Sequence, residues 1–199
     1  MADDSLRAKW DARHGDAEKS PSVARVLEEN LHLLPPSGHA LDLACGLGGN
    51  ALVLAEQGLD VSAWDLSPVA IERLQGIAAA EGLTNLQAEV RDVERQPPSS
   101  GSFDVIVVSY YLERTLIPAL ISALKPGGLI FYQTFTAIAV GDEGPSNPDF
   151  RLGDNELLDL FRPLKVRCYR EEDRLGDLTR GVRDVAMLVA ERSVSGLRG

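Results

Sequence analysis

Cysteine and basic residues are scarce in this sequence, and long hydrophobic runs are missing. Only Cys45 and Cys168 occur among 199 residues, and neither belongs to a pair with metal-ligand spacing, which disfavours a disulfide scaffold and a metal site. The formal net charge of -10 repels phosphate backbones, so nucleic acid is a poor candidate ligand. No apolar stretch suits a membrane span, and residues 1–10 lack the apolar core of a signal peptide. We therefore expect a cytoplasmic protein that binds neither nucleic acid nor a membrane.

Composition and hydrophobic patterning predict one α/β domain. With 44% hydrophobic and 25% charged residues, the chain can fill a single globular core. From residue 20 onward, apolar runs typical of strands alternate with amphipathic stretches typical of helices. Strands are expected at residues 39–44, 61–65, 86–90, 103–109 and 129–135. Helices are expected at residues 21–34, 68–80 and 116–124, and after the glycine-rich segment that follows the first strand. This alternation predicts a doubly wound parallel sheet with helices on both faces.

The C-terminal part of the chain breaks this alternation. Asp154 is expected to cap a short helix, and two strand-like runs follow at residues 164–169 and 182–191. Since no long helical pattern separates them, we expect them to pair antiparallel at one edge of the sheet. Residues 137–150 form the one long irregular segment, which is typical of lids and binding loops.

A glycine-rich segment, LDLACGLGGNA at residues 41–51, joins the first expected strand to a helix. Glycines there let the chain turn sharply and let a ligand approach main-chain N–H groups. Gly46, Gly48 and Ala51 also satisfy the dinucleotide fingerprint, and Asp65, 19 positions after Gly46 (65 − 46), suits a ribose-binding acid. The segment therefore predicts an adenosine ligand, either a nicotinamide dinucleotide or S-adenosylmethionine.

Three carboxylates favour the second ligand. Asp42, Asp65 and Asp92 lie at or near the ends of successive expected strands, and this edge of an open α/β sheet carries its ligand crevice. Asp42 would repel a pyrophosphate, whereas it suits a cofactor that bears an ammonium and a sulfonium group. Asp92 can accept a hydrogen bond from an adenine amino group. Each acid taken alone also fits a helix cap or a solvated loop.

Five segments resemble, in order and spacing, the motifs of class I S-adenosylmethionine-dependent methyltransferases. They are LDLACGLGGNA, VSAWDLSP, AEVRDVE, FDVIVVSYYL and LKPGGLIFYQTF. The pair Trp10-Asp11 with Arg13, and Gly-Pro-x-Asn-Pro within residues 144–157, resemble the tellurite-resistance (TehB-type) small-molecule methyltransferases. The resemblance implies a Rossmann-like fold with a mostly parallel seven-stranded sheet, an antiparallel C-terminal strand and helices on both faces. It also implies one methyltransferase domain at residues 20–199 and an N-terminal segment, residues 1–19, that closes over the cofactor.

The resemblance further assigns roles to individual residues. Asp42 and the glycines would line the methionine end of S-adenosyl-L-methionine, Asp65 would hold the ribose hydroxyls, and Asp92 would contact the adenine. Arg13 would pair with the cofactor carboxylate. The implied cofactor-binding residues are Arg13, Asp42, Ala44, Gly46, Gly48, Asn50, Asp65, Leu66, Asp92, Val93 and Ser109.

Residues after the fourth and fifth expected strands are the candidates for binding a methyl acceptor: Tyr110, Tyr111, Glu113, Arg114, Gln133 and Thr134. Methyl transfer from a sulfonium is an in-line displacement that leaves S-adenosyl-L-homocysteine, so positioning and a dry pocket matter more than an acid or base. Tyr110 is the first candidate for the pocket wall, and Arg114 could orient an anionic acceptor. The Asn-Pro-Pro-Tyr motif of nitrogen methylation is missing, which favours a soft or ionised nucleophile such as tellurite, a selenium compound, a thiol or an oxyanion.

Two other functions stay open at this point. One is an NAD(P)-dependent oxidoreductase, although no Tyr-x-x-x-Lys or similar hydride-transfer set is evident. The other is a non-catalytic regulator that binds S-adenosylmethionine. The sequence fits a monomer or a homodimer equally well.

Overall fold

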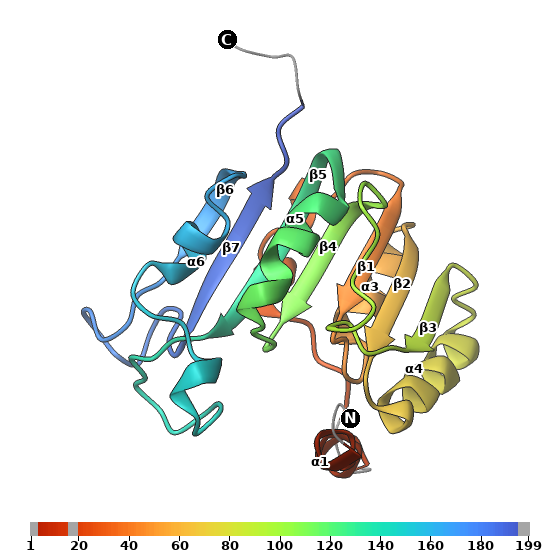
Figure 1. The fold of residues 1–199 in the computed structure, drawn as a ribbon, viewed down its shortest axis with the longest axis horizontal. Coiled ribbons are helices and arrows are strands. Elements are labelled where there is room, and N and C mark those ends of the chain that lie inside the picture. Colours follow the sequence, from red (N-terminus) through yellow and green to blue (C-terminus); the bar gives the residue numbers. More distant parts are fainter. Residues whose placement is uncertain (1–3, 16–19, 195–199) are drawn as a thin grey trace.

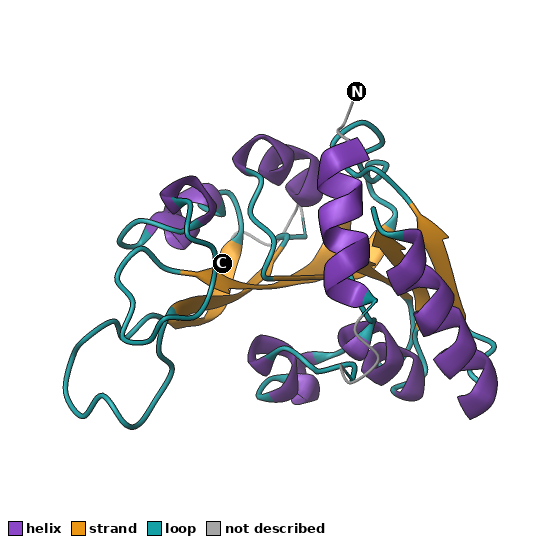
Figure 2. Ribbon diagram, turned by 90° about the horizontal axis from the view of Figure 1, so that it is seen from below, coloured by secondary structure: helices purple, strands orange, loops and turns teal. Residues whose placement is uncertain are grey.

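A twisted seven-stranded sheet with helices on both faces forms the centre of the protein (Figures 1 and 2). The computed structural model describes residues 4–15 and 20–194. The strands are β1 (His39–Leu43), β2 (Asp60–Asp65), β3 (Leu86–Val90), β4 (Phe103–Ser109), β5 (Leu124–Phe135), β6 (Lys165–Arg170) and β7 (Val185–Glu191). The helices are α1 (Asp4–His14), α2 (Arg25–Glu28), α3 (Gly49–Glu56), α4 (Pro68–Glu81), α5 (Ile117–Ala123) and α6 (Glu156–Leu160).

The strand order is β3-β2-β1-β4-β5-β7-β6, and it confirms the doubly wound sheet. Neighbouring strands from β3 to β5 are parallel, whereas β7 runs antiparallel to both β5 and β6. The order reverses between β1 and β4, because the chain first builds outward through β2 and β3 and then returns to the other side of β1. Such a switch point opens a crevice at the carboxyl ends of the strands.

Two hydrophobic cores cover the two faces of the sheet. On one face, α5 and α6 pack against the sheet through side chains such as Leu120 and Leu157. On the other, α2, α3 and α4 contribute Leu27, Leu54 and Leu74. The valine-rich strand β4 lies between the cores and is almost entirely buried, as its continuous apolar pattern predicts.

The helix predicted for residues 21–34 is wrong in its extent. Residues 20–24 are irregular, and only α2 and the 3-10 turn Leu31–Leu33 are helical. Long-range hydrogen bonds explain the difference, because the N–H groups of Ala24 and Val26 donate to the side chains of Asn50 (2.8 Å) and Gln133 (2.9 Å). The segment therefore lies against β5, β7 and the start of α3 instead of continuing a helix.

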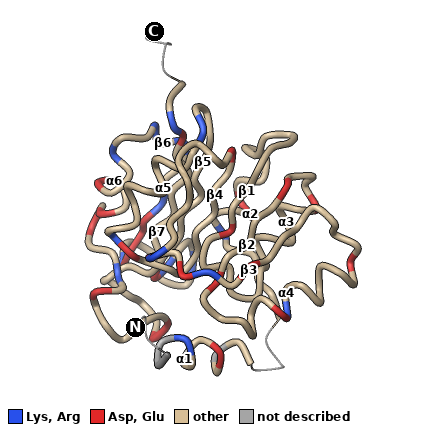
Figure 3. The backbone as a smooth tube through the Cα atoms, turned by 45° about the vertical axis from the view of Figure 1, so that its right-hand side comes forward, with Lys and Arg blue, Asp and Glu red and all other residues tan. Residues whose placement is uncertain are grey.

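The C-terminal part agrees with the prediction except at one cap. The antiparallel pairing of β6 and β7 at the sheet edge is confirmed. The predicted cap Asp154 is wrong, since Asn155 occupies the N-cap of α6, with φ 57° and no side-chain capping bond. None of the described helices is long and apolar enough to cross a membrane. Along the described chain, Lys and Arg positions are interspersed with Asp and Glu positions (Figure 3).

Candidate functional site

The loop between β1 and α3 turns sharply at the carboxyl edge of the sheet. Ala44, Gly46 and Gly48 all have positive φ angles, of 55°, 52° and 79°. A left-handed conformation is costly for alanine, so the position of Ala44 is held by its surroundings. The N–H of the next residue, Cys45, donates to the carbonyl of Trp64 at 3.0 Å, which joins the loop to the end of β2.

The glycines of this loop differ in what they make room for. A Cβ at Gly48 would collide with the Leu74 side chain of α4, and one at Gly49 would collide with the backbone of Ser22. Gly46 instead faces α1, where a Cβ would come within 3.2 Å of the His14 ring. Close packing against neighbouring segments therefore explains why positions 48 and 49 are glycine. The sequence pattern alone does not reveal this packing requirement.

Asp42 is a fully buried carboxylate at the end of β1. Its Oδ2 accepts a hydrogen bond from the Ala51 N–H at 3.0 Å, and its Oδ1 accepts a weaker one from Asn50 Nδ2 at 3.4 Å. Burial raises the pKa of Asp42 to about 7, despite these two bonds. Among the described residues, no cationic side chain forms an ion pair with Asp42.

Asn50 connects Asp42 to two other elements. Its Oδ1 accepts the Ala24 N–H, and its Nδ2 lies 3.1 Å from Ser109 Oγ at the end of β4. The structure thus brings Asp42, Asn50 and Ser109 together, as their places at the sheet edge predict.

Asp65, at the end of β2, accepts a hydrogen bond at each carboxylate oxygen. Gly46 N–H donates to Oδ2 and Ser67 N–H donates to Oδ1, both at 2.8 Å. Each oxygen keeps a lone pair for one further donor. Asp65 is 8% exposed, so it is nearly buried at the carboxyl edge of the sheet. Leu66, which follows it, is half-buried.

Asp92 lies beyond β3 in a turn. Its Oδ1 accepts hydrogen bonds from the N–H groups of Glu94 (3.1 Å) and Arg95 (3.3 Å), and its Oδ2 lies 3.3 Å from Arg95 Nε. Val93 is buried beside it. These contacts are those of a turn-capping acid, one of the two interpretations that the sequence left open for Asp92.

Helix α1 lies at the edge where the parallel strands end (Figure 1). Ser67 Oγ donates to a carboxylate oxygen of Asp11, and Arg73 Nη1 donates to the carbonyl of His14 at 2.6 Å. The rings of Trp10 and His14 are stacked, with centroids 5.9 Å apart. These contacts place α1 against α4 and beside Gly46. The side chain of Arg13 and residues 16–19 lie outside the described part of the structure, so the expected role of Arg13 stays a prediction.

Tyr110 follows β4 and is 50% exposed. Its φ is 58°, its N–H donates to the Gln133 carbonyl at 2.8 Å, and its Oη accepts a hydrogen bond from Gln133 Nε2 at 2.7 Å. The Tyr110 ring lies against Phe135, with centroids 5.0 Å apart. Burial raises the pKa of Tyr110 above its usual value, and the charge of Glu143 raises it further.

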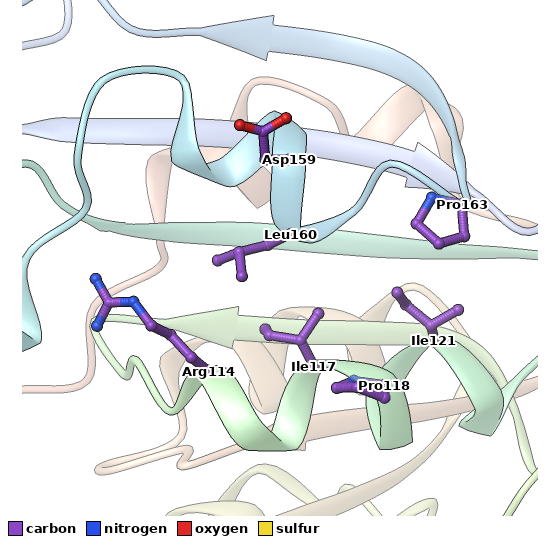
Figure 4. Close-up of a pocket in the computed structure, with 7 residues that line it drawn as sticks. All are labelled: Arg114, Ile117, Pro118, Ile121, Asp159, Leu160 and Pro163. Carbon is purple, nitrogen blue, oxygen red and sulfur yellow. The ribbon is translucent and has the colours of Figure 1, made fainter.

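Arg114 lies at the start of the turn before α5 and is held by protein acceptors. Its Nε and Nη2 donate to the two carboxylate oxygens of Glu156 (2.6 and 3.0 Å), and it also donates to the carbonyls of Asp149 and Arg151. It borders a groove of about 420 Å³ between α5 and α6, whose other walls are Ile117, Pro118, Ile121, Asp159, Leu160 and Pro163 (Figure 4). This groove is separate from the glycine loop.

Comparison with known proteins identifies the domain. A family model described as "Methyltransferase domain" matches residues 40–128. These residues, just under half of the chain, resemble a methyltransferase domain. They include β1 to β4, the glycine loop and the acids Asp42, Asp65 and Asp92, and the complete sheet has the class I methyltransferase fold.

Two curated relatives are named as methyltransferases, one of a hydroxyquinolone and one of ubiquinone biosynthesis. A ubiquinone biosynthesis O-methyltransferase of Albidiferax ferrireducens is 33% identical over 155 residues, which are 69% of this chain and 60% of that protein. A 2-heptyl-1-hydroxyquinolin-4(1H)-one methyltransferase of Mycobacteroides abscessus is 33% identical over 93 residues, 46% of this chain and 39% of that protein. The chain therefore spans 60% and 39% of the length of these two relatives, less than two thirds of either.

A solved structure with the same fold is TehB from Haemophilus influenzae. The TM-score is 0.69 with 21% sequence identity, and the match covers 93% of this chain and 67% of that one. At this identity the likeness establishes the fold alone.

The structure also adds residues to the candidate site that sequence reasoning missed. Ala24, Phe135 and Glu156 support Asn50, Tyr110 and Arg114 respectively. No spacing rule links these residues, because each pair is joined only by the fold.

Proposed function

We propose that the protein transfers the methyl group of S-adenosylmethionine to an oxygen atom of a small acceptor molecule. The observation that carries this proposal is Asp42, a buried carboxylate beside the glycine loop without a cationic partner in the described part of the chain. A buried negative charge is costly unless a positive charge offsets it. An ammonium–sulfonium ligand supplies that charge, whereas the pyrophosphate of NAD(P) would add repulsion. This difference favours a methyltransferase over an oxidoreductase.

The residues around the loop fit such a ligand. Asp42, with Asn50, would stabilise the cationic methionine end next to Gly46. Asp65 would accept the two ribose hydroxyls with its remaining lone pairs, and Leu66, with Val93 and Asp92, would border the adenine. When bound, S-adenosylmethionine supplies a methyl group on a positively charged sulfur. Helix α1 and the rest of residues 1–19 would close this part of the site against water.

In-line displacement requires mainly that the protein position the acceptor in line with the methyl group. Tyr110 and Phe135 would form one wall beside the reacting centre, and the fixed loop would hold the opposite side. Arg114 would act through its contacts with Glu156 and residues 149–151, which hold the end of the long loop near β4. We expect the acceptor to be a hydroxyl or oxyanion compound, since the relatives include an O-methyltransferase by name. Tellurite, a selenium compound and a thiol belong in the same test panel, because they need no base.

The test is release of S-adenosylhomocysteine by the purified chain in the presence of each acceptor. A catechol, a hydroxyquinolone, tellurite, selenite and a thiol would be compared with a no-acceptor blank. Turnover that depends on the oxygen acceptors supports the proposal. Cofactor binding without turnover of any acceptor would instead favour a non-catalytic S-adenosylmethionine-binding regulator.

A further inference from the structure

We infer that Gln133 holds the Tyr110 hydroxyl as a hydrogen-bond donor toward the acceptor, and that the site therefore selects acceptors with a hydrogen-bond-accepting oxygen on an aromatic or apolar body. This inference rests on the proposed function and deepens it. It names Gln133 as a positioning residue, since it acts through Tyr110.

The orientation of the Gln133 amide follows from one backbone contact. The Val26 N–H lies 2.9 Å from Gln133 Oε1, and a backbone N–H can only donate. The atom facing Val26 must therefore be the oxygen, which leaves Nε2 facing Tyr110. Gln133 is 1% exposed, so turning the amide over would leave two donors facing each other without water to separate them.

The polarity of the Tyr110 hydroxyl follows from the amide. Gln133 Nε2 only donates, so Tyr110 Oη must accept at 2.7 Å, and its own proton must point elsewhere. Within the described residues, the structure gives this hydroxyl no other hydrogen-bond partner. Tyr110 is 50% exposed at the carboxyl end of β4, so this proton is available to a molecule bound there.

The backbone supports the same assignment. Gln133 holds both ends of Tyr110, because its carbonyl also accepts the Tyr110 N–H at 2.8 Å. This contact keeps Tyr110 at φ 58°, a left-handed conformation that costs about 1–3 kcal/mol for a residue other than glycine. Such strain concentrates at sites where a side chain must be aimed.

The surroundings indicate the kind of acceptor. The Phe135 ring, 5.0 Å from that of Tyr110, makes the wall beside the donor apolar and aromatic. Burial and Glu143 raise the pKa of Tyr110, so the phenol keeps the proton that it would donate at neutral pH. An aromatic compound with a phenolate, carbonyl or hydroxyl oxygen matches both features.

The experiment reverses the direction of the hydrogen bond between residue 133 and the Tyr110 hydroxyl, and it keeps the shape of the side chain at position 133. In Gln133→Glu the carboxylate can accept from Val26 and from Tyr110 at once, which turns the hydroxyl proton inward. The probe is 4-nitrocatechol, whose absorbance reports binding in the presence of saturating S-adenosylhomocysteine. We expect Gln133→Glu and Tyr110→Phe each to weaken probe binding roughly tenfold, the effect of one hydrogen bond. The double variant should be no weaker than either single variant.

Two further measurements separate this inference from general damage and from failure of the proposed function. Tyr169→Phe is the matched control, because the Tyr169 hydroxyl lies on the edge strand β6 and already donates to Glu171, and this variant should bind the probe as wild type does. The side-chain amide NMR signal of Gln133 should have a different chemical shift in Tyr110→Phe than in wild type, with or without turnover. Equal probe affinity in all variants, no binding by wild type, or an unmoved amide signal would overturn the inference. If wild type does not bind S-adenosylhomocysteine at all, the proposed function is rejected instead.

Discussion

The buried carboxylate of Asp42 predicts an unusual dependence of stability on pH. Burial raises its pKa from 3.8 to about 7 in the folded protein. Between these values the folded state holds a proton on Asp42 and the unfolded state does not, so stability falls as pH rises through this window. A difference of about three pH units at 1.36 kcal/mol each corresponds to about 4 kcal/mol, which is present below pH 4 and lost above pH 7.

The perturbation is Asp42→Asn, which has nearly the same shape as protonated aspartic acid and cannot ionise. The free energy of unfolding of both proteins would be measured by urea denaturation from pH 4.5 to pH 8. We expect the free energy of unfolding of the variant to rise relative to that of wild type as the pH increases, by about 3 kcal/mol between pH 4.5 and pH 8. Ionisable groups that do not interact with Asp42 affect both proteins equally and cancel in the difference.

Asp60→Asn is the control, because it removes a negative charge from the exposed start of β2 and leaves Asp42 in place. The free energy of unfolding of Asp60→Asn should fall with rising pH as that of wild type does. Saturating S-adenosylmethionine should reduce this loss of stability with rising pH in wild type, because a cationic ligand favours ionised Asp42. Parallel profiles of wild type and Asp42→Asn across the whole range would refute this reasoning.

Three further outcomes can be tested on single variants. Asp65→Ala should weaken S-adenosylmethionine binding by about 1–3 kcal/mol in calorimetry, and unchanged affinity would reject its role at the ribose. Gly49→Ala should lower the free energy of unfolding by about 1–3 kcal/mol, because its Cβ meets backbone, whereas Gly76→Ala, with open space around it, should not destabilise α4. Arg114→Gln should break the contact with Glu156 and speed proteolytic cleavage within residues 137–152. The affinity for the cofactor should stay the same. An unchanged cleavage rate would contradict the role of Arg114 in holding this loop.

The sheet was largely predictable because its signals are local. The valine-rich pattern of β4 and the Ser67–Pro68 start of α4 each depend on a few adjacent residues. The segment before β1 was not predictable in the same way. Its helical pattern is overridden by the bonds of Ala24 and Val26 to side chains 26 and 107 positions away.

The candidate site likewise contains residues that the sequence predicts and residues that only long-range contacts bring together. The acids Asp42 and Asp65 fall at the crevice because strand ends and topology place them there. Their partners, and those of Tyr110 and Arg114, lie elsewhere in the chain. Gln133 is 23 positions from Tyr110, and Glu156 is 42 positions from Arg114. Such pairs carry no sequence spacing of their own, so only the folded chain identifies them.

The central claim is that the crevice around Asp42 binds a positively charged adenosyl ligand. Isothermal titration of the wild-type chain with S-adenosylmethionine, beside NADH and NADPH, tests it most directly. We expect saturable binding of one S-adenosylmethionine per chain, weakened in Asp42→Asn, and no binding of either dinucleotide. Binding of NADH or NADPH, or the absence of any heat with S-adenosylmethionine, would contradict it.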